Sequence, residues 1–465
     1  MTGPLTANRH ATATPAPADT HSSRRPPPTS WRPVLTGDEA TAASGIAREV
    51  AHRLADHERV AAAVERARSM PTEPRLVHWR PEGLWQGYAG LALLSATLDE
   101  IAPNDGWDLV GRDQIRSAAA GLERRTDSGS GFVAAVGGVA AAAEALSRGG
   151  GRYQTLRRTL DATLAELAAA QVGSVAAAPP HGVVVSSYDV IGGLTSVGRR
   201  LLDRPGEAAD ALTELLGCLV ALSSAGTDGI PHWHTPVHRL TGSFLPAAYP
   251  AGHLNLGLAH GVPGPLALLS LALSAGIEVP GQRDAIHRTA DSIARARLED
   301  DWGVTFPIVV GIGSNATPPT PARNAWCYGP PGVARALWLA GVAVDRADLR
   351  DLAEETMLAV GARPVAARRI DSPTVCHGVA GLLAITLRFA ADTGRAEFER
   401  AATDLVRQLV AAFEPESTFG YRNLEPSGGR VDHPGLLDGA AGVALALLAA
   451  TTAVEPRWDR VLLLS

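Results

Sequence analysis

The chain has 465 residues, of which 46% are hydrophobic, and its formal net charge is −6. This length and apolar content suffice for a large buried interior and exclude a disordered chain. The slightly acidic balance and the lack of a basic stripe exclude nucleic acid as an expected partner. Three cysteines (Cys218, Cys327 and Cys376) are too few for a disulfide framework, so we expect a protein of the reducing cytoplasm.

The amino-terminal residues 1–44 are rich in Pro, Thr, Ser and Ala and contain no apolar block. They lack the apolar core of a secretory signal, and we expect a flexible tail there. The two most apolar stretches, residues 265–279 and 440–454, are short for a bilayer span. We therefore expect core helices and no transmembrane segment.

After the tail, a motif of the form G-x-x-G followed by an apolar run recurs along the chain. Its seven copies start at Gly87, Ala135, Gly193, Gly261, Gly329, Gly378 and Gly439. The intervals between these starts leave room for two helices per copy. Each apolar run is hydrophobic nearly all round, which predicts an inner helix that is buried on both sides.

Amphipathic segments lie between the motif copies, with apolar residues at three- and four-residue spacing and charged residues opposite. They predict outer helices with one face in water. The ranges are 45–69, 155–171, 207–223, 283–297, 347–361 and 396–413.

Seven inner and seven outer helices bury all their apolar faces if they close into two concentric rings. We therefore predict an all-α domain over residues 45–465, an (α/α)7 toroid, with an open solenoid of helix pairs as the alternative. The motif glycines would permit tight turns and close backbone approach where the inner helices begin. Residues 224–252 and 302–324 break the helical pattern and predict irregular insertions, with short strands near 301–310.

In a closed ring, the residues just before each first glycine meet at one mouth. The chemically distinctive residues near this register are Asp189, His260, Arg323, Cys327, Tyr328, Cys376 and His377. Two thiols and an imidazole on adjacent repeats suggest a Cys2His zinc site whose fourth position is left for water or substrate. Helix amino termini favour thiolates and would support such a site.

By spacing alone the zinc signal is weak, because Cys327 and Cys376 are far apart and no C-x-x-C is present. Two buried, inert thiols are the alternative on the residues alone. A further histidine-rich stretch, "HWHTPVH" at residues 232–238, favours surface or peptide contacts over a second metal site. Cys218 lies in an outer-helix pattern and is expected to be a core residue.

Three segments together resemble the signature motifs of LanC-type lanthipeptide cyclases: "GLAHGVPG" (257–264), "NAWCYGPPG" (324–332) and "VCHGVAGLL" (375–383). "GLWQGYAGLALL" (83–94) and the closing "RWDRVLLLS" (457–465) support this resemblance, which covers roughly residues 45–465. It implies the same toroid, with one zinc ion held by Cys327, Cys376 and His377. Ser196 departs from the pattern, because the third repeat usually carries glycine there, and this puts local packing in doubt.

The chemistry implied by the resemblance is the addition of a precursor-peptide thiol to dehydroalanine or dehydrobutyrine, which forms lanthionine or methyllanthionine thioethers. The zinc would deprotonate the thiol, and the resulting enolate needs stabilisation and a proton at its α-carbon. His260 is the expected acid, with a structural histidine as the alternative. Asp189 would orient His260 or accept the thiol proton.

Arg323 would stabilise the enolate charge, although a structural ion pair between Asp189 and Arg323 is an equal alternative. Tyr328 would donate a hydrogen bond to the enolate or to a ligand, or would serve only as a packed aromatic residue.

The expected partners are a dehydrated precursor peptide with its leader and a separate dehydratase, since no dehydration module precedes the repeats. Any membrane association would be peripheral, with a membrane-bound synthesis and export complex. Two other functions stay open: a related enzyme that adds glutathione or another small thiol to dehydrated residues, and a non-catalytic zinc-containing scaffold that binds peptides.

Overall fold

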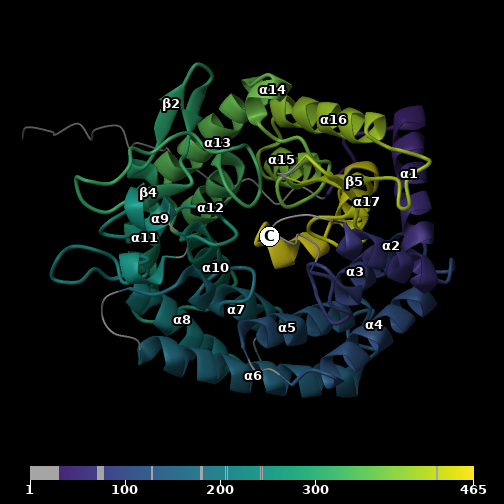
Figure 1. The fold of residues 1–465 in the computed structure, drawn as a ribbon, viewed down its shortest axis with the longest axis horizontal. Coiled ribbons are helices and arrows are strands. Elements are labelled where there is room, and N and C mark those ends of the chain that lie inside the picture. Colours follow the sequence, from purple (N-terminus) through teal and green to yellow (C-terminus); the bar gives the residue numbers. More distant parts are fainter. Residues whose placement is uncertain are drawn as a thin grey trace, which may run out of the picture.

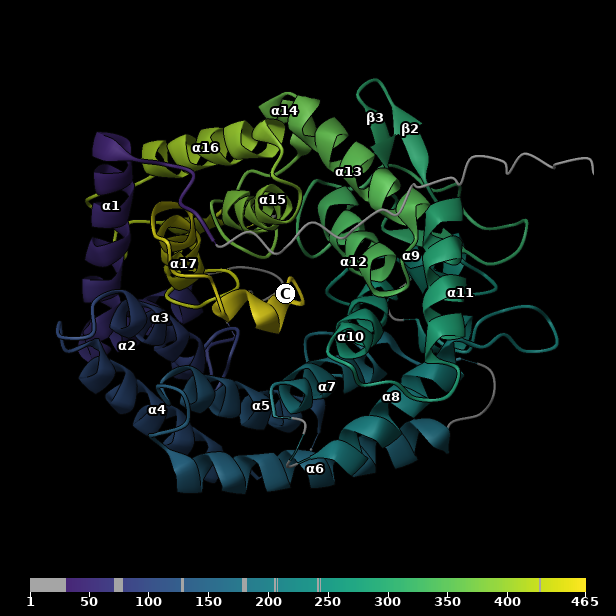
Figure 2. The same cartoon turned by 180° about the vertical axis from the view of Figure 1, so that it is seen from behind.

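The computed structural model describes residues 31–70, 78–126, 129–177, 182–204, 208–240, 244–425 and 428–465, together with Gly206 and Gly242. Within these residues the chain forms two concentric rings of helices (Figure 1 and Figure 2). The inner ring consists of α3 (Tyr88–Ile101), α5 (Ser130–Ala145), α7 (Leu194–Leu202), α10 (Pro263–Ser274), α12 (Pro330–Ala343), α15 (Val379–Thr393) and α17 (Ala440–Thr451). The outer ring consists of α1 (Gly37–Ala55), α4 (Trp107–Glu123), α6 (Gln154–Ala176), α8 (Ala209–Ser223), α11 (Gln282–Arg295), α13 (Ala347–Ala362) and α16 (Ala396–Ala411).

The inner ring is closed, because each inner helix contacts its neighbours and α17 contacts α3. Small residues make the close contacts. In six of the seven repeats, a Cβ added to a motif glycine would lie 2.6–3.2 Å from a side chain of the preceding repeat. These contacts are Gly90 with Leu436, Gly138 with Leu84, Gly264 with Val190, Gly332 with Leu258, Gly381 with Trp326, and Gly442 with Val375. The predicted toroid is confirmed and the open solenoid is excluded.

The first glycine of the motif allows the backbone to approach itself where an inner helix begins. Gly87, Gly193, Gly329, Gly378 and Gly439 are the N-caps of their helices, and a Cβ at each would collide with backbone atoms of the preceding turn. At Gly329, a φ of +116° additionally requires glycine. The need for glycine at the other four positions is steric, since their φ values are negative.

Several boundaries differ from the sequence prediction. The range 45–69 contains two helices, α1 and α2 (His57–Ser69), because Asp56 ends the first and caps the second by accepting from the amides of Glu58 and Arg59. Helix α1 begins at Gly37, ahead of residue 45, and residues 1–30 of the expected tail lie outside the described residues.

The sequence ranges also missed α4, the remaining outer helix. Its buried face includes Gly111, Ala118 and Gly121, which are too small to give a strong apolar stripe. In the second repeat the inner helix starts at Ser130, before the motif, although Gly138 still makes the glycine contact. In the third, α7 starts directly after Gly193 despite Ser196.

The two ranges expected to be irregular carry short elements. Residues 224–252 include a 3-10 turn, η2 (Val237–Arg239), and the short helix α9 (Phe244–Ala248). Two-stranded antiparallel sheets pair β1 (His253–Asn255) with β4 (Val309–Gly311), and β2 (Leu298–Asp300) with β3 (Gly303–Thr305). The remaining elements are α14 (Val365–Arg368), η1 (Val185–Ser187) and a third two-stranded sheet of β5 (Arg422–Leu424) and β6 (Arg430–Asp432). The sequence did not predict this third sheet.

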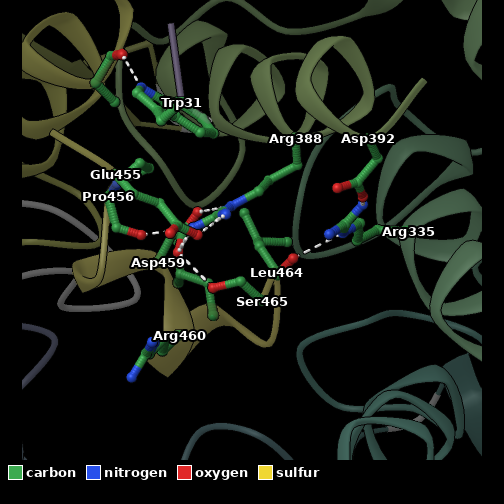
Figure 3. Close-up of polar contacts among 12 residues, drawn as sticks. Trp31, Arg335, Arg388, Asp392, Glu455, Pro456, Asp459, Arg460, Leu464 and Ser465 are labelled. Atoms are coloured by element: carbon green, nitrogen blue, oxygen red, sulfur yellow. Dashed lines mark hydrogen bonds and ion pairs between the residues drawn. The ribbon is translucent and has the colours of Figure 1, made fainter. Parts of the chain in front are cut away.

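The carboxy-terminal segment 455–465, which includes the 3-10 turn η3 (Trp458–Leu462), lies at the centre of the inner ring (Figure 1). Arg388 of α15 binds both carboxylate oxygens of Asp459, at 2.7 and 2.8 Å, and also binds Glu455 (Figure 3). Arg335 of α12 pairs with Asp392 and donates to the carbonyl of Leu464. We call residues 455–465 the central plug.

None of the helices in the described part of the chain is both long and apolar enough to cross a bilayer.

Candidate functional site

A circle of hydrogen bonds joins the repeats where the inner helices begin. Five links run from a peptide N–H of one repeat to a carbonyl of the next, over 2.9–3.2 Å. The last link runs from the indole of Trp85 in the first repeat to Ile191 in the third, so the circle includes six of the seven repeats. The links are Val190 to Ala259, Ala259 to Cys327, Cys327 to Cys376, Cys376 to Leu437, Leu437 to Trp85, and Trp85 Nε1 to Ile191. This circle, which we call the mouth ladder, fixes the register that the sequence predicted.

The mouth ladder makes Cys327 and Cys376 direct neighbours, although 48 residues separate them along the chain. The peptide N–H of Cys327 donates to the carbonyl of Cys376 at 3.1 Å. Their side chains meet too: the hydrogen bond with Cys327, followed by burial, raises the pKa of the Cys376 thiol well above its ordinary value. Such a thiol stays protonated unless a cation stabilises its thiolate.

His377 and Asp438 complete a cluster with Cys376. One potential ligand atom of each of these three residues lies within 4.8 Å of the others. His377 Nδ1 is 3.7 Å from a carboxylate oxygen of Asp438, while Nε2 is buried and has no hydrogen-bond partner. Burial lowers the pKa of His377; the charge of Asp438 opposes this shift, and the charge of Arg323 adds to it. The net shift is downward, so the ring is neutral and has a lone pair for a metal.

These residues fit a zinc ion. Thiolate sulfur and imidazole nitrogen are the usual protein ligands of zinc, and the buried Nε2 of His377 is an acceptor that no protein group uses. Among the described residues, Cys376, His377 and Asp438 form the one cluster of three or more metal-binding side chains with this geometry. Cys327 adds a second sulfur through its contact with Cys376.

Asp189 and His260 form a second unit at the mouth. Asp189 is buried, and one of its carboxylate oxygens accepts from the amides of Gly192 and Gly193 at 2.9 Å each. The other oxygen lies 2.6 Å from His260 Nδ1. The side chain of His260 remains 36% exposed, so its ring is anchored at one nitrogen and accessible to a substrate. The structure thus pairs Asp189 with His260 and not with Arg323.

Tyr328 lies beside both units. Its ring is tilted over His260 at a centroid separation of 6.1 Å, and its hydroxyl accepts from Asn255 Nδ2 at 3.5 Å. Burial raises the pKa of Tyr328, which keeps the phenol protonated and able to donate. Arg323 is exposed at the rim, and its electrostatic effect reaches His377. The predicted residues of the mouth thus gather in one place.

Sequence reasoning missed Asp438, its partner Gln86, and His433. Asp438 directly precedes Gly439 and Gln86 directly precedes Gly87, the same register that singled out His260 and His377. His433 is fully buried, accepts from the amide of Gly435 at Nδ1, and has its pKa lowered to about 4 by burial.

Two other features of the sequence are not part of the metal-binding cluster. In "HWHTPVH", His234 is buried and bonded to the carbonyl of Pro231, and the stretch forms no metal-binding cluster among the described residues. Cys218 is half-buried in α8, packs against the core, and has its pKa raised to about 11 by burial.

Comparison with known proteins identifies similar chains. The family model described as lanthionine synthetase C-like protein matches residues 78–463. The nisin biosynthesis protein NisC of Lactococcus lactis subsp. lactis is 25% identical over 251 residues, which are 52% of this chain and 59% of that protein. The match thus spans less than two thirds of that relative. The solved structure of nisin cyclase has a TM-score of 0.72, with 21% identity over 87% of this chain and 95% of its own, and shares the fold.

Proposed function

Since this chain belongs to the lanthionine synthetase C-like family, we propose that it is a zinc-dependent peptide cyclase that forms lanthionine or methyllanthionine rings. The observation that carries the proposal is the meeting of two thiols and an imidazole, Cys327, Cys376 and His377, beside the anchored histidine His260. The two thiols and the imidazole of His377 are suited to thiol activation. His260 is suited to the proton transfer that must follow.

The substrate class is a dehydrated peptide that contains both a cysteine and a dehydroalanine or dehydrobutyrine. Cys327, Cys376 and His377 would hold the zinc, which when bound would stabilise a peptide thiolate at neutral pH. The thiolate sulfur forms a bond to the β-carbon, and the π electrons of the double bond move to give an enolate. A proton delivered to the α-carbon completes the thioether without loss or gain of atoms.

His260 is the proposed acid for that proton. Asp189 occupies Nδ1, which leaves Nε2 as the ring nitrogen that can face a substrate. The carboxylate of Asp189 is fixed by two amides, so it orients the imidazole. Asp189 is thus proposed as a positioning residue for His260.

Arg323 and Tyr328 are proposed to stabilise the enolate. The exposed guanidinium of Arg323 offers a positive charge at the rim, and the protonated phenol of Tyr328 offers a hydrogen-bond donor next to His260. The proposed partners are the precursor peptide with its leader and a separate dehydratase, and cytoplasmic location remains part of the proposal.

The test is incubation of the protein with a dehydrated, cysteine-containing peptide, followed by thiol alkylation and mass spectrometry. Cyclisation leaves the peptide mass unchanged and removes alkylatable thiols. A scaffold would leave every thiol alkylatable, and an enzyme that adds an external thiol would increase the mass by that of the thiol.

His260→Ala separates acid catalysis from metal binding. We expect this variant to keep wild-type zinc content and to lose or misdirect ring formation. Unchanged ring formation by His260→Ala would remove the catalytic role of this histidine.

A further inference from the structure

Asp438 lies where the last repeat meets the first, and none of the roles above uses it. It precedes Gly439, the N-cap of α17, so it occupies the same position in its repeat as His377 does in the preceding one. The neighbouring link of the mouth ladder, from the N–H of Leu437 to the carbonyl of Trp85, brings it next to the first repeat. Its side chain is only 17% exposed.

Gln86 of the first repeat holds the Asp438 carboxylate. The Nε2 amide of Gln86 donates to Asp438 Oδ2 at 3.0 Å, and its Oε1 accepts from the peptide N–H of His78 at 2.8 Å. Both ends of the Gln86 amide are thus engaged, which fixes its orientation. The ion-pair contacts of the described residues give Asp438 no arginine partner, and its carboxylate faces His377 of the metal-binding cluster.

The second carboxylate oxygen of Asp438 faces the predicted ligands. Oδ1 is 3.7 Å from Nδ1 of His377, and the carboxylate also contacts the thiol of Cys376. On His377, the other ring nitrogen, Nε2, is the buried atom without a partner. A histidine that binds a metal through one nitrogen commonly has its other nitrogen directed at a carboxylate.

We propose that Asp438, held by Gln86, is a positioning residue of the metal site, which orients His377 and strengthens metal binding through its negative charge. The inference rests on the proposed function, since it requires that Cys327, Cys376 and His377 bind zinc. It makes metal affinity depend on the closure of the ring, because Gln86 belongs to the first repeat and Asp438 to the last.

The experiment is a zinc-affinity measurement by competition with a chromophoric chelator, on the full chain and with no peptide substrate. We expect Asp438→Ala to weaken zinc binding by about 10- to 100-fold, the usual effect of removing such an outer partner. Asp438→Asn should weaken it nearly as much, because the amide keeps the shape but loses the charge. Gln86→Ala should have a smaller effect in the same direction.

Asp432→Asn is the matched control. Asp432 belongs to the same repeat, accepts from the amide of Thr418 at 2.9 Å, and is not a member of the metal-binding cluster. Its replacement should leave zinc affinity unchanged. Far-ultraviolet circular dichroism of each variant checks the fold, and Asp438→Asn and Gln86→Ala keep the test open if Asp438→Ala does not fold.

Two results would overturn the inference. Wild-type zinc affinity in folded Asp438→Asn and Gln86→Ala would show that neither residue supports the metal. A shift of the ligand-field bands of the Co²⁺-substituted protein on Asp438→Ala would place Asp438 among the ligands themselves, whereas a positioning role leaves these bands in place. Failure of the wild-type protein to bind zinc would instead contradict the proposed function.

Discussion

The mouth and the central plug both place polar side chains inside the toroid, but these side chains differ in their interaction partners. In the plug, Arg388 is paired with Asp459 and Glu455, and its guanidinium lies 5.0 Å over the ring of Trp31. At the mouth, ring nitrogens of His377 and His433 are buried without partners. His433 Nε2 carries the proton of the neutral ring, because Nδ1 accepts from the Gly435 amide, and the indole N–H of Trp458 in the plug is likewise a donor without a partner. The Nε2 of His377 is therefore the acceptor at the mouth that is available to a metal ion.

Trp326 connects the two regions. It directly precedes Cys327, and its indole N–H donates to the carbonyl of Leu462 in the plug at 3.1 Å. The plug therefore supports the segment that carries one proposed zinc ligand. The comparison predicts that plug variants lose stability, and that mouth variants lose metal or catalysis.

Arg388→Ala is expected to have the largest effect on stability. It leaves Asp459, whose side chain is 1% exposed, as a buried charge that has lost its main partner. Removing one partner of such a pair costs about 3–5 kcal/mol. The measurement is the free energy of unfolding in urea. A loss below about 1 kcal/mol would mean that the plug does not lock the ring.

The pH dependence of stability should reveal His433. Burial lowers its pKa from 6.5 to about 4, so between these values the unfolded chain takes up a proton that the folded chain does not. Above about pH 6.5, His433 therefore does not reduce the free energy of unfolding. Below that pH, its contribution lowers the free energy of unfolding by up to about 1.4 kcal/mol per pH unit, which amounts to roughly 3 kcal/mol at pH 4.

The check is urea unfolding of the wild type and His433→Asn from pH 7 to pH 4. The asparagine carbonyl can replace Nδ1 as acceptor for the Gly435 amide, but it does not titrate. The difference between the two proteins should shift in favour of the variant as pH falls. Parallel pH profiles would contradict the account of His433.

Trp326→Phe tests the connection between the regions. It removes the indole donor and leaves the buried Leu462 carbonyl without that hydrogen bond, which should cost about 1–3 kcal/mol. Zinc content should remain at the wild-type level, because the cysteine backbone is also held by the mouth ladder. Loss of zinc with little loss of stability would contradict this prediction, because Trp326 would then support the metal site more than the fold.

Arg283→Ala is the smallest expected effect. Arg283 pairs with Glu278 at 2.9 Å, but both side chains are about half exposed, and such surface pairs contribute about 0–1 kcal/mol. An effect as large as that of Arg388→Ala would show that burial does not distinguish the plug from the surface.

The sequence predicted the toroid because the feature that builds it is local. Each G-x-x-G motif marks the start of an inner helix or a close contact between repeats, and the amphipathic pattern identified most of the outer helices. The helix α4 was not predicted because half of its buried residues are small, such as Gly111 and Ala118, and do not give a strong apolar stripe. The break between the helices α1 and α2 at Asp56 was not predicted, because the apolar pattern continues through it.

The site was only partly predictable for a related reason. The register before the motif glycine located His260, Cys327, Cys376 and His377 within their repeats. The pairing of Asp189 with His260, rather than with Arg323, depends on the distance across neighbouring repeats, which spacing does not give. The mouth ladder could not be predicted either, because backbone hydrogen bonds between repeats do not depend on the side-chain pattern.

The central claim, that the mouth binds zinc through Cys327, Cys376 and His377, is tested most directly by metal analysis of Cys376→Ala beside Cys218→Ala. Cys218 is the matched control, a half-buried thiol in the outer helix α8. We predict about one zinc per chain in the wild type and Cys218→Ala, and a substantially lower content in Cys376→Ala. Full zinc content in a folded Cys376→Ala variant would contradict the claim.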